Sequence, residues 1–266
     1  MGALDDTFVN CRAAGRPAFI AYLTAGDPDL ETTARLLPAL VAGGADIIEL
    51  GVPFSDPIAD GPVNQRAAVR ALDAGTTLDG ILDLVARQRD ELGVPIVLFT
   101  YYNPIHARGV ETFAEQASAS GVDGVLCLDR PPDEVDGSFI PTLHKHGLDT
   151  IFLLAPTSTK ERVRKIAEAS SGFVYYVART GVTGAGTEID KPLLRRVRQL
   201  RRKLKQPLAV GFGLGTPERV RALAPAVDGV VVGSALVELV EQHATDDDLT
   251  DQLEAKVRTL TGALRN

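Results

Sequence analysis

The chain has 266 residues, of which 45% are hydrophobic and 5% aromatic, and its formal net charge is −7. This length can bury a large core without disulfides or metals, and the negative charge disfavours nucleic acid as the main partner. Cys11 and Cys127, the two cysteines, form no Cys-x-x-Cys pair, so we expect a reducing compartment and no thiolate metal site. No apolar run reaches membrane-spanning length and no signal pattern opens the chain, so the sequence predicts a cytoplasmic protein with no membrane segment.

Short apolar runs alternate with segments of helical periodicity along almost the whole chain. The eight runs expected to be strands are residues 18–23, 45–50, 95–100, 124–128, 150–154, 173–177, 208–211 and 229–232. Each run is followed by a turn-forming residue and then by apolar residues at helical spacing. This alternation predicts a parallel sheet that is covered by helices.

Eight strand–helix units fit a closed (β/α)₈ barrel, the TIM barrel, whose usual length is about 250 residues. The pattern alone leaves an open doubly wound sheet possible. No low-complexity linker divides the chain, so we expect a single domain over residues 1–266. Asp27 and Pro28 predict the start of the first barrel helix, as its N-cap and first-turn proline. The helices expected beyond one per strand lie at residues 4–14, 65–74, 78–92 and 249–264.

A basic segment, residues 195–205, carries seven Arg and Lys side chains. Leu193, Val197 and Leu200 recur there at helical spacing, so the basic side chains are expected on the solvated face of an outer helix. This pattern does not indicate a nucleic-acid site.

Several kinds of chemistry lack the residues they need. No lysine falls within an expected strand, which disfavours a Schiff-base mechanism. His144 and His146 are two residues apart and do not share a helical face, and no strand-end histidine pair offers a metal site. Cys127 lies inside an expected strand and is interpreted as a packed thiol. Carboxylates at the strand ends therefore remain for proton transfer.

Glu49 and Asp60 are the best candidates, because barrel active sites lie at the carboxyl ends of the strands. Glu49 lies near the end of an apolar strand, where desolvation would raise its pKa toward neutrality. The sequence pattern fits two interpretations of Glu49 about equally well: a general acid/base, or a structural glutamate that hydrogen-bonds the backbone of a neighbouring loop. Asp60, viewed alone, reads slightly better as a turn aspartate. Asp27 and Asp56 are interpreted as structural.

The loops after the last three strands are rich in glycine and short hydroxyl residues. Glycine allows backbone N–H groups to approach an anion closely, and Ser234 would open a helix whose dipole favours negative charge. A phosphate near strands seven and eight is common in barrels. Tight turns alone would also explain these glycines, but three such loops favour a phosphate site.

Seven blocks of the sequence, taken together, resemble the tryptophan synthase α-subunit family. The longest is GADIIELGVPFSDPIADGP at residues 44–62, which contains both candidate carboxylates. The others stand in the family's order at residues 18–28, 101–104, 155–158, 179–184, 211–213 and 233–234. The resemblance spans nearly the whole chain.

This resemblance implies a (β/α)₈ barrel that cleaves indole-3-glycerol phosphate to indole and glyceraldehyde 3-phosphate, without a metal or a cofactor of its own. Glu49 matches the residue that handles protons at indole C3 and at the glycerol hydroxyl, and Asp60 matches the acceptor for the indole N–H. Thr183 matches a position in the family's mobile loop, which closes beside the loop of Asp60. The implied phosphate positions are Gly184, Gly213, Gly233 and Ser234. The implied indole-pocket positions are Tyr22, Tyr101, Leu126, Leu153, Tyr175, Phe212 and Val231.

The resemblance also implies a partner, the pyridoxal-phosphate β subunit, in an α₂β₂ heterotetramer that passes indole between the two sites. Residues 53–56 and the loop of Asn103 and Pro104 would face it. Arg130, Gly215 and Ala21 depart from residues common in the family, and none of them is part of the carboxylate pair.

Three other functions stay open at this point. A stand-alone indole-3-glycerol-phosphate lyase of the same fold would release free indole. A phosphosugar isomerase or epimerase barrel would be expected to show strand-end metal ligands or a Lys/His pair, which the sequence lacks. A catalytically idle barrel is disfavoured by the presence of Glu49 and Asp60.

Overall fold

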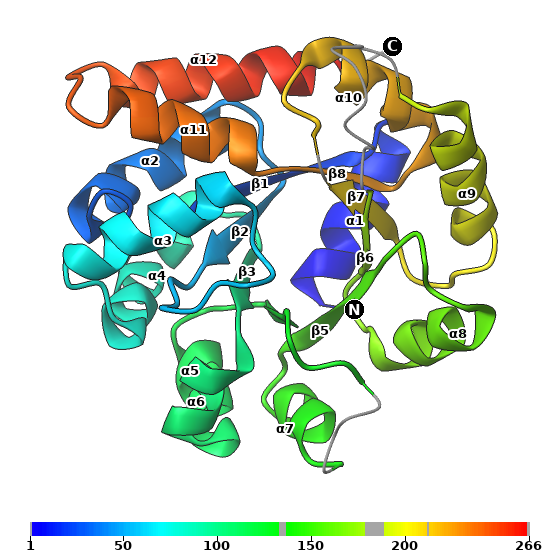
Figure 1. Ribbon diagram of the computed structural model, residues 1–266, viewed down its shortest axis with the longest axis horizontal. Coiled ribbons are helices and arrows are strands. Elements are labelled where there is room, and N and C mark those ends of the chain that lie inside the picture. Colours follow the sequence, from blue (N-terminus) through cyan, green and yellow to red (C-terminus); the bar gives the residue numbers. More distant parts are fainter. Residues whose placement is uncertain (1, 133–136, 179–188, 212, 265–266) are drawn as a thin grey trace.

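The structure, a computed structural model, describes residues 2–132, 137–178, 189–211 and 213–264. Within them, parallel strands form a closed barrel in chain order, and the last strand pairs with the first (Figure 1). The strands are β1 (Ala18–Thr24), β2 (Ile47–Gly51), β3 (Ile96–Thr100), β4 (Gly124–Cys127), β5 (Asp149–Leu154), β6 (Val174–Val177), β7 (Leu208–Gly211) and β8 (Gly229–Val232). The closed barrel confirms the predicted (β/α)₈ fold and excludes the open sheet.

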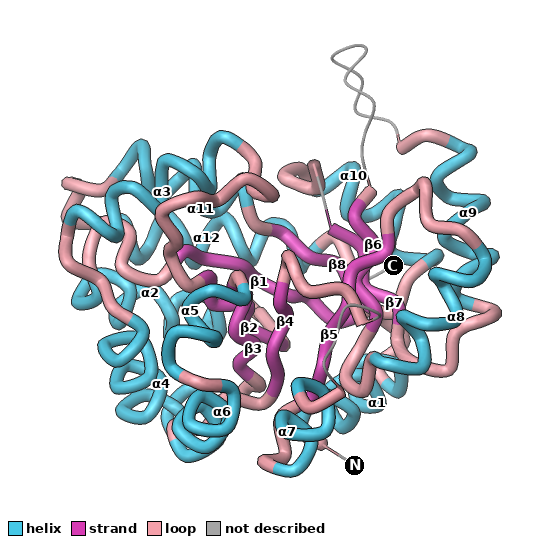
Figure 2. The backbone as a smooth tube through the Cα atoms, turned by 60° about the horizontal axis from the view of Figure 1, so that its bottom comes forward, coloured by secondary structure: helices cyan, strands magenta, loops and turns pink. Residues whose placement is uncertain are grey.

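Helices surround the barrel on its outer side, as Figure 2 shows with helices in cyan around magenta strands. They are α1 (Ala3–Ala13), α2 (Leu30–Ala42), α3 (Pro62–Asp73), α4 (Leu78–Leu92), α5 (Tyr102–Arg108), α6 (Val110–Ala119), α7 (Phe139–Lys145), α8 (Lys160–Ala169), α9 (Lys191–Arg201), α10 (Pro217–Leu223), the 3₁₀ turn η1 (Ala224–Ala226), α11 (Ser234–His243) and α12 (Leu249–Gly262). The four additional helices predicted from the sequence correspond to α1, α3, α4 and α12. In the described part of the chain, no helix is long and apolar enough to cross a membrane.

The barrel interior is filled by every second residue of the strands, because side chains alternate between the two faces of a strand. Ile20, Ile47, Val97, Leu126, Ile151, Phe173, Ala209 and Val231 form this inner core. Helix α1 closes the amino-terminal end, where its Leu4, Phe8 and Cys11 pack against the same cluster. The opposite end of the barrel therefore remains for the active site.

The first barrel helix begins two residues later than the sequence predicts. Its N-cap is Asp29, whose carboxylate accepts a hydrogen bond from the Thr32 backbone N–H at 2.6 Å. The prediction that Asp27 would be the N-cap was wrong. Asp27 instead pairs with Arg70, which lies 43 residues further along the chain. A distant partner of this kind leaves no local signature in the sequence.

The basic segment behaves largely as predicted. Helix α9 buries Val197 and Leu200 against the barrel, and Arg195 and Arg198 are exposed. The helix ends at Arg201, so residues 202–205 extend beyond it.

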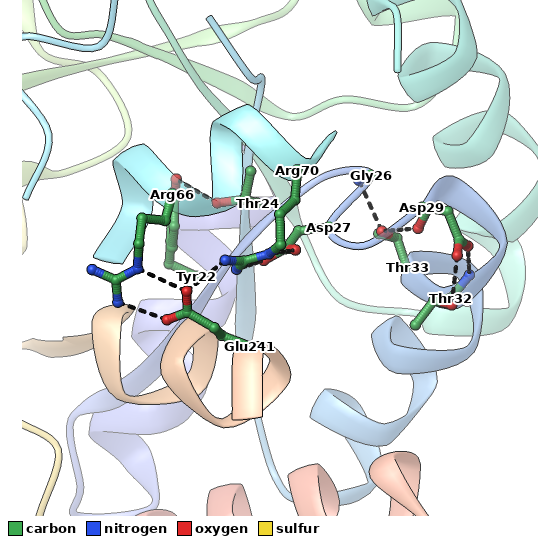
Figure 3. Close-up of polar contacts among 10 residues, drawn as sticks. All are labelled: Tyr22, Thr24, Gly26, Asp27, Asp29, Thr32, Thr33, Arg66, Arg70 and Glu241. Carbon is green, nitrogen blue, oxygen red and sulfur yellow. Dashed lines mark hydrogen bonds and ion pairs between the residues drawn. The ribbon is translucent and has the colours of Figure 1, made fainter. Parts of the chain in front are cut away.

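A network of ion pairs joins α3 to the loop after β1 and to α11 (Figure 3). Arg70 on α3 donates two hydrogen bonds of 2.7 Å to Asp27, which is only 3% exposed. Arg70 and Arg66 also donate to Glu241 on α11. The residues before α3 carry Asp60, and the first turn of α11 carries Ser234. The network therefore holds together two helices whose amino-terminal ends both reach the open end of the barrel.

Replacing Arg70 by Met should destabilise the fold, because it leaves the buried Asp27 carboxyl without its cation. We expect the free energy of unfolding to fall by roughly 3 kcal/mol, measured by urea denaturation. Arg66→Met is the matched control on the same helix. Arg66 is 52% exposed, so its loss should cost much less than that of Arg70. Equal losses in the two variants would contradict the special role of Arg70.

Candidate active site

A cavity of about 330 Å³ opens at the carboxyl ends of the strands. Its floor and walls are formed by Val231 of the inner core and by the inward-facing side chains one layer above it: Tyr22, Glu49, Phe99, Leu128, Leu153 and Tyr175. The loop after β2, the loop after β7 and the first turn of α11 complete the lining. The alternation of strand side chains between the inside and the outside of the barrel therefore determines both which residues fill the inner core and which residues face the cavity.

Glu49 is the acidic residue of the wall. It lies on β2 two residues after the inward-facing Ile47, and it pairs in register with Tyr22 of β1. Its side chain is 0% exposed, and neither carboxyl oxygen has a hydrogen-bond partner among the described residues. Burial raises the pKa of Glu49 to about 8, because a charged carboxylate loses its hydration there. Near neutral pH the group is therefore mainly a protonated acid.

Two tyrosines flank Glu49, and each is accommodated by a glycine. A Cβ on Gly51 would come within 2.3 Å of the Tyr22 hydroxyl, and one on Gly211 within 2.1 Å of the Tyr175 hydroxyl. Burial raises the pKa of both phenols. The charge of Asp60 adds to this at Tyr22, and at alkaline pH, where Glu49 is ionised, its charge raises the pKa of both. Both phenols therefore remain neutral and supply polar but uncharged walls.

Asp60 is carried by the loop between β2 and α3. Its carboxylate accepts a 2.7 Å hydrogen bond from the Tyr101 hydroxyl, which in turn accepts one of 3.0 Å from the Ala59 backbone N–H. Burial raises the pKa of Asp60, while hydrogen bonds from Tyr101 and Asn64 act in the opposite direction. The carboxylate is thus held at the edge of the cavity by a tyrosine 41 residues away.

A further side of the cavity is formed by the loop after β7 and the start of α11. Gly213 and Gly215 come from the loop after β7, and Gly233, Ser234 and Ala235 come from the start of α11. The first N–H groups of a helix have no partner within the helix, and the helix dipole favours an anion beside them. This side of the cavity can therefore bind a phosphate through N–H groups.

The structure brings most of the predicted site residues into one cavity. Lining it are Glu49, Asp60, Tyr22, Leu153, Tyr175, Gly213, Val231, Gly233 and Ser234. Tyr101 and Leu126 are placed differently: Tyr101 lies behind Asp60, and Leu126 is fully buried one layer deeper, in the inner core. Thr183, Gly184 and Phe212 lie outside the described residues.

Several lining residues were not identified from the sequence. Phe99 and Leu128 share the inward face with Val97 and Leu126, so strand alternation could have found them. Asn64, in the first turn of α3, also lines the cavity, and its buried side-chain oxygen has no hydrogen-bond partner among the described residues. No local pattern distinguishes Asn64 from any other polar residue at a helix start.

The three residues that depart from the family lie in different surroundings. The guanidinium of Arg130 is 3.8 Å from the centre of the Tyr102 ring, a cation–π contact. Ala21 is fully buried on the outer face of β1, among the residues that pack under the helices. Gly215 lines the cavity, and a Cβ there would lie 2.7 Å from that of Ala235. None of the three contacts described here involves Glu49 or Asp60.

Within the described residues, no group of three or more His, Cys, Asp or Glu side chains is arranged to hold a metal ion. The chemistry visible in the cavity is instead that of a buried acid, a second carboxylate and an anion-binding backbone.

Comparison with known proteins points to one family. A family model described as tryptophan synthase alpha chain matches residues 8–265. The tryptophan synthase alpha chain of Geobacter sulfurreducens is 49% identical over 265 residues, which cover 100% of this chain and 98% of the relative. That of Solibacter usitatus is 51% identical over 245 residues, with 92% and 91% covered.

Solved structures agree with these relatives. The crystal structure of tryptophan synthase subunit alpha from Legionella pneumophila superposes with a TM-score of 0.91 at 37% identity, covering 99% of this chain and 98% of that one. A crystal structure of tryptophan synthase from Mycobacterium tuberculosis in its aminoacrylate-bound form gives a TM-score of 0.88 at 35% identity, with 100% of both chains covered.

The raised pKa of Glu49 predicts a specific dependence of stability on pH. From about pH 4.5 to about pH 8, the folded chain retains a proton that the unfolded chain has released. The free energy of unfolding therefore falls as pH rises through this window. Glu49→Gln removes the effect, so at about pH 9 the variant should be more stable than the parent chain by on the order of several kcal/mol.

Urea denaturation of both proteins across this pH range measures the difference. Glu115→Gln is the control, because Glu115 is exposed on α6 and its neutralisation should leave the pH profile unchanged. Parallel pH profiles for Glu49→Gln and the parent would show that Glu49 is not held protonated by the fold.

Proposed function

This chain belongs to the tryptophan synthase alpha chain family, and from that premise we propose how its site performs the family's reaction. The chain is a tryptophan synthase α subunit, a carbon–carbon lyase of tryptophan biosynthesis. It cleaves indole-3-glycerol phosphate to indole and glyceraldehyde 3-phosphate. The observation that carries the proposed mechanism is the buried, unpartnered carboxyl of Glu49 in the same cavity as Asp60.

In the proposed reaction, Glu49 begins as a neutral acid, which suits its raised pKa. Its proton goes to C3 of the indole ring, and the positive charge that forms is shared with the ring N–H, which donates to Asp60. The Glu49 carboxylate then accepts the proton of the glycerol hydroxyl next to the bond that breaks. That hydroxyl carbon becomes the aldehyde of glyceraldehyde 3-phosphate, and the electron pair of the broken bond returns to the ring. Glu49 ends the cycle protonated, as it began.

The remaining walls orient the substrate. Tyr22, Phe99, Leu153 and Tyr175 give the indole ring an apolar slot with neutral hydroxyl groups. Gly213, Gly233 and Ser234 hold the phosphate through N–H groups and the dipole of α11. We assign Tyr101 to positioning Asp60 through its 2.7 Å hydrogen bond. By their family positions, Thr183 is proposed to belong to the closing loop and Gly184 to bind the phosphate. Phe212 and Leu126 are proposed to line the indole pocket.

The proposed partner is a pyridoxal-phosphate β subunit in an α₂β₂ heterotetramer that receives the indole. The residues proposed to face it are 53–56, Asn103 and Pro104. Residues 53–56 are linked to the proposed catalytic Asp60 through Tyr101. The centres of the Phe54 and Tyr101 rings are 5.0 Å apart, and the Tyr101 hydroxyl donates a hydrogen bond to Asp60. Contact with a partner at this loop can therefore alter the position of the carboxylate. We further propose that residues 1–266 act as one domain, and that the enzyme works in the cytoplasm.

Glu49→Gln and Asp60→Asn should each reduce turnover of indole-3-glycerol phosphate by at least about 100-fold, the scale of a lost acid/base group. Indole release by the purified variants measures this, with thermal unfolding to confirm that each variant is folded. Glu115→Gln should retain full activity. Normal turnover by Glu49→Gln would exclude the proposed mechanism.

Titration with a β subunit separates the proposed heterotetramer from a stand-alone lyase that releases free indole. We expect turnover by the parent chain to rise as β is added, and turnover by the Ile58→Ser variant not to respond. Ile58 lies in the loop that carries Asp60 and is 89% exposed. An apolar side chain that is so exposed is suited to contact with the apolar surface of a partner. Val69→Ser, at an apolar side chain 56% exposed on α3, is the control and should keep the response. Turnover that is already maximal without β would favour the stand-alone enzyme.

A further inference from the structure

The cavity poses an electrostatic problem for the substrate of the proposed function, on which this inference rests. Its described lining contains two carboxyl groups, Glu49 and Asp60, and no lysine, arginine or histidine. The substrate adds a phosphate, which carries up to two further negative charges. Backbone N–H groups and a helix dipole compensate only part of such a charge, since a helix end is equivalent to roughly half an elementary charge.

Two basic side chains lie directly behind the phosphate side of the cavity. Arg219 on α10 donates a 2.7 Å hydrogen bond to the Gly213 carbonyl oxygen. Lys256 on α12 donates one of 3.1 Å to the Gly215 carbonyl oxygen. Both glycines line the active-site cavity. The two cations therefore hold the back of the loop whose front faces the substrate.

The same two side chains line a second cavity of about 420 Å³. It shares four lining residues with the active site, namely Gly213, Gly215, Ser234 and Ala235. This loop and the first turn of α11 therefore form part of the wall between the two cavities. Glu238 and His243 also line the second cavity, so one carboxylate stands against the two cations there.

We propose that Arg219 and Lys256 are positioning residues for the substrate phosphate. Each fixes a carbonyl of the phosphate loop. Because a peptide is planar, Arg219 thereby also fixes the N–H of Leu214, which lines the active-site cavity, and Lys256 fixes that of Thr216 at the start of α10. A charged donor polarises the peptide more strongly than a neutral one. The two positive charges also attract the phosphate across a thin layer of protein, where screening by water is weak. They act from outside the cavity and do not touch the reacting atoms.

The test compares binding of glyceraldehyde 3-phosphate and of inorganic phosphate, by calorimetry, with the kinetics of the full-length chain. Lys256→Met and Arg219→Met should each weaken binding of both probes about tenfold. KM for indole-3-glycerol phosphate should rise in parallel while kcat stays within about twofold. Lys256→Arg should restore most of the affinity. In Lys256→Met, added salt should weaken binding less than in the parent chain, because one attracting charge is gone.

The matched control is Arg258→Met, which removes the same charge from the same helix. Arg258 is exposed and donates to the Ala42 carbonyl and to Glu254, so its loss should leave phosphate affinity unchanged. A variant that fails to fold, as judged by thermal unfolding, is replaced by the more polar Lys256→Gln or Arg219→Gln.

Ser234→Asp distinguishes failure of this inference from failure of the phosphate site itself. It places a negative charge at the start of α11 and should abolish phosphate binding. Weak binding in Ser234→Asp together with parental affinity in the Arg219 and Lys256 variants would overturn the inference and leave the proposed function intact. Parental affinity in Ser234→Asp would instead overturn the assigned phosphate site. A second equivalent of inorganic phosphate, lost only in Lys256→Met, would make the second cavity an anion site and also overturn the positioning role.

Discussion

Closure of the barrel is the constraint on which the site depends. Because β8 pairs with β1, each strand has neighbours on both sides and its residues alternate strictly between interior and exterior. The register then arranges the inward side chains in layers. Ile47 lies in a layer that is wholly apolar, and Glu49, two residues later, lies in the layer that meets the cavity. A rigid wall thus holds the carboxyl in a dry position that a flexible loop could not provide.

The other parts of the site are brought to this wall by loops and helix ends, and they depend on contacts between distant residues. Asp60 is held by Tyr101, and α3, which follows Asp60, is joined to α11 through Arg70, Asp27 and Glu241. The acid is therefore placed by strand register alone, whereas the second carboxylate and the phosphate side are placed by hydrogen bonds and ion pairs. This division suits a site in which one group must stay dry and the other groups must admit a substrate.

The sequence predicted the strands well because their signal is local. An apolar run followed by a turn residue needs no knowledge of the rest of the chain, and α4, β7 and β8 have the predicted bounds. It failed for Asp27, read as a helix cap, because the residue that determines its role is Arg70. The pattern also could not decide whether Glu49 bonds a loop, since that required knowing that no described residue reaches its oxygens. Asp60 read as a turn aspartate for the same reason, because Tyr101 was not visible as its partner.

The negative charges in the cavity, which make phosphate binding difficult, also favour the acid that the proposed reaction needs. A like charge nearby disfavours ionisation of a carboxyl group, so a bound phosphate opposes loss of the Glu49 proton, as burial already does. Burial also raises the pKa of Asp60, but Tyr101 and Asn64 donate hydrogen bonds that stabilise its charged form and oppose that shift. This contrast between the two carboxyl groups suits Glu49 as the proton donor and Asp60 as the acceptor. Cations inside the cavity would reduce this contrast by stabilising an ionised Glu49. Placing Arg219 and Lys256 behind the phosphate loop keeps their charge close to the phosphate and outside the cavity that holds the acid.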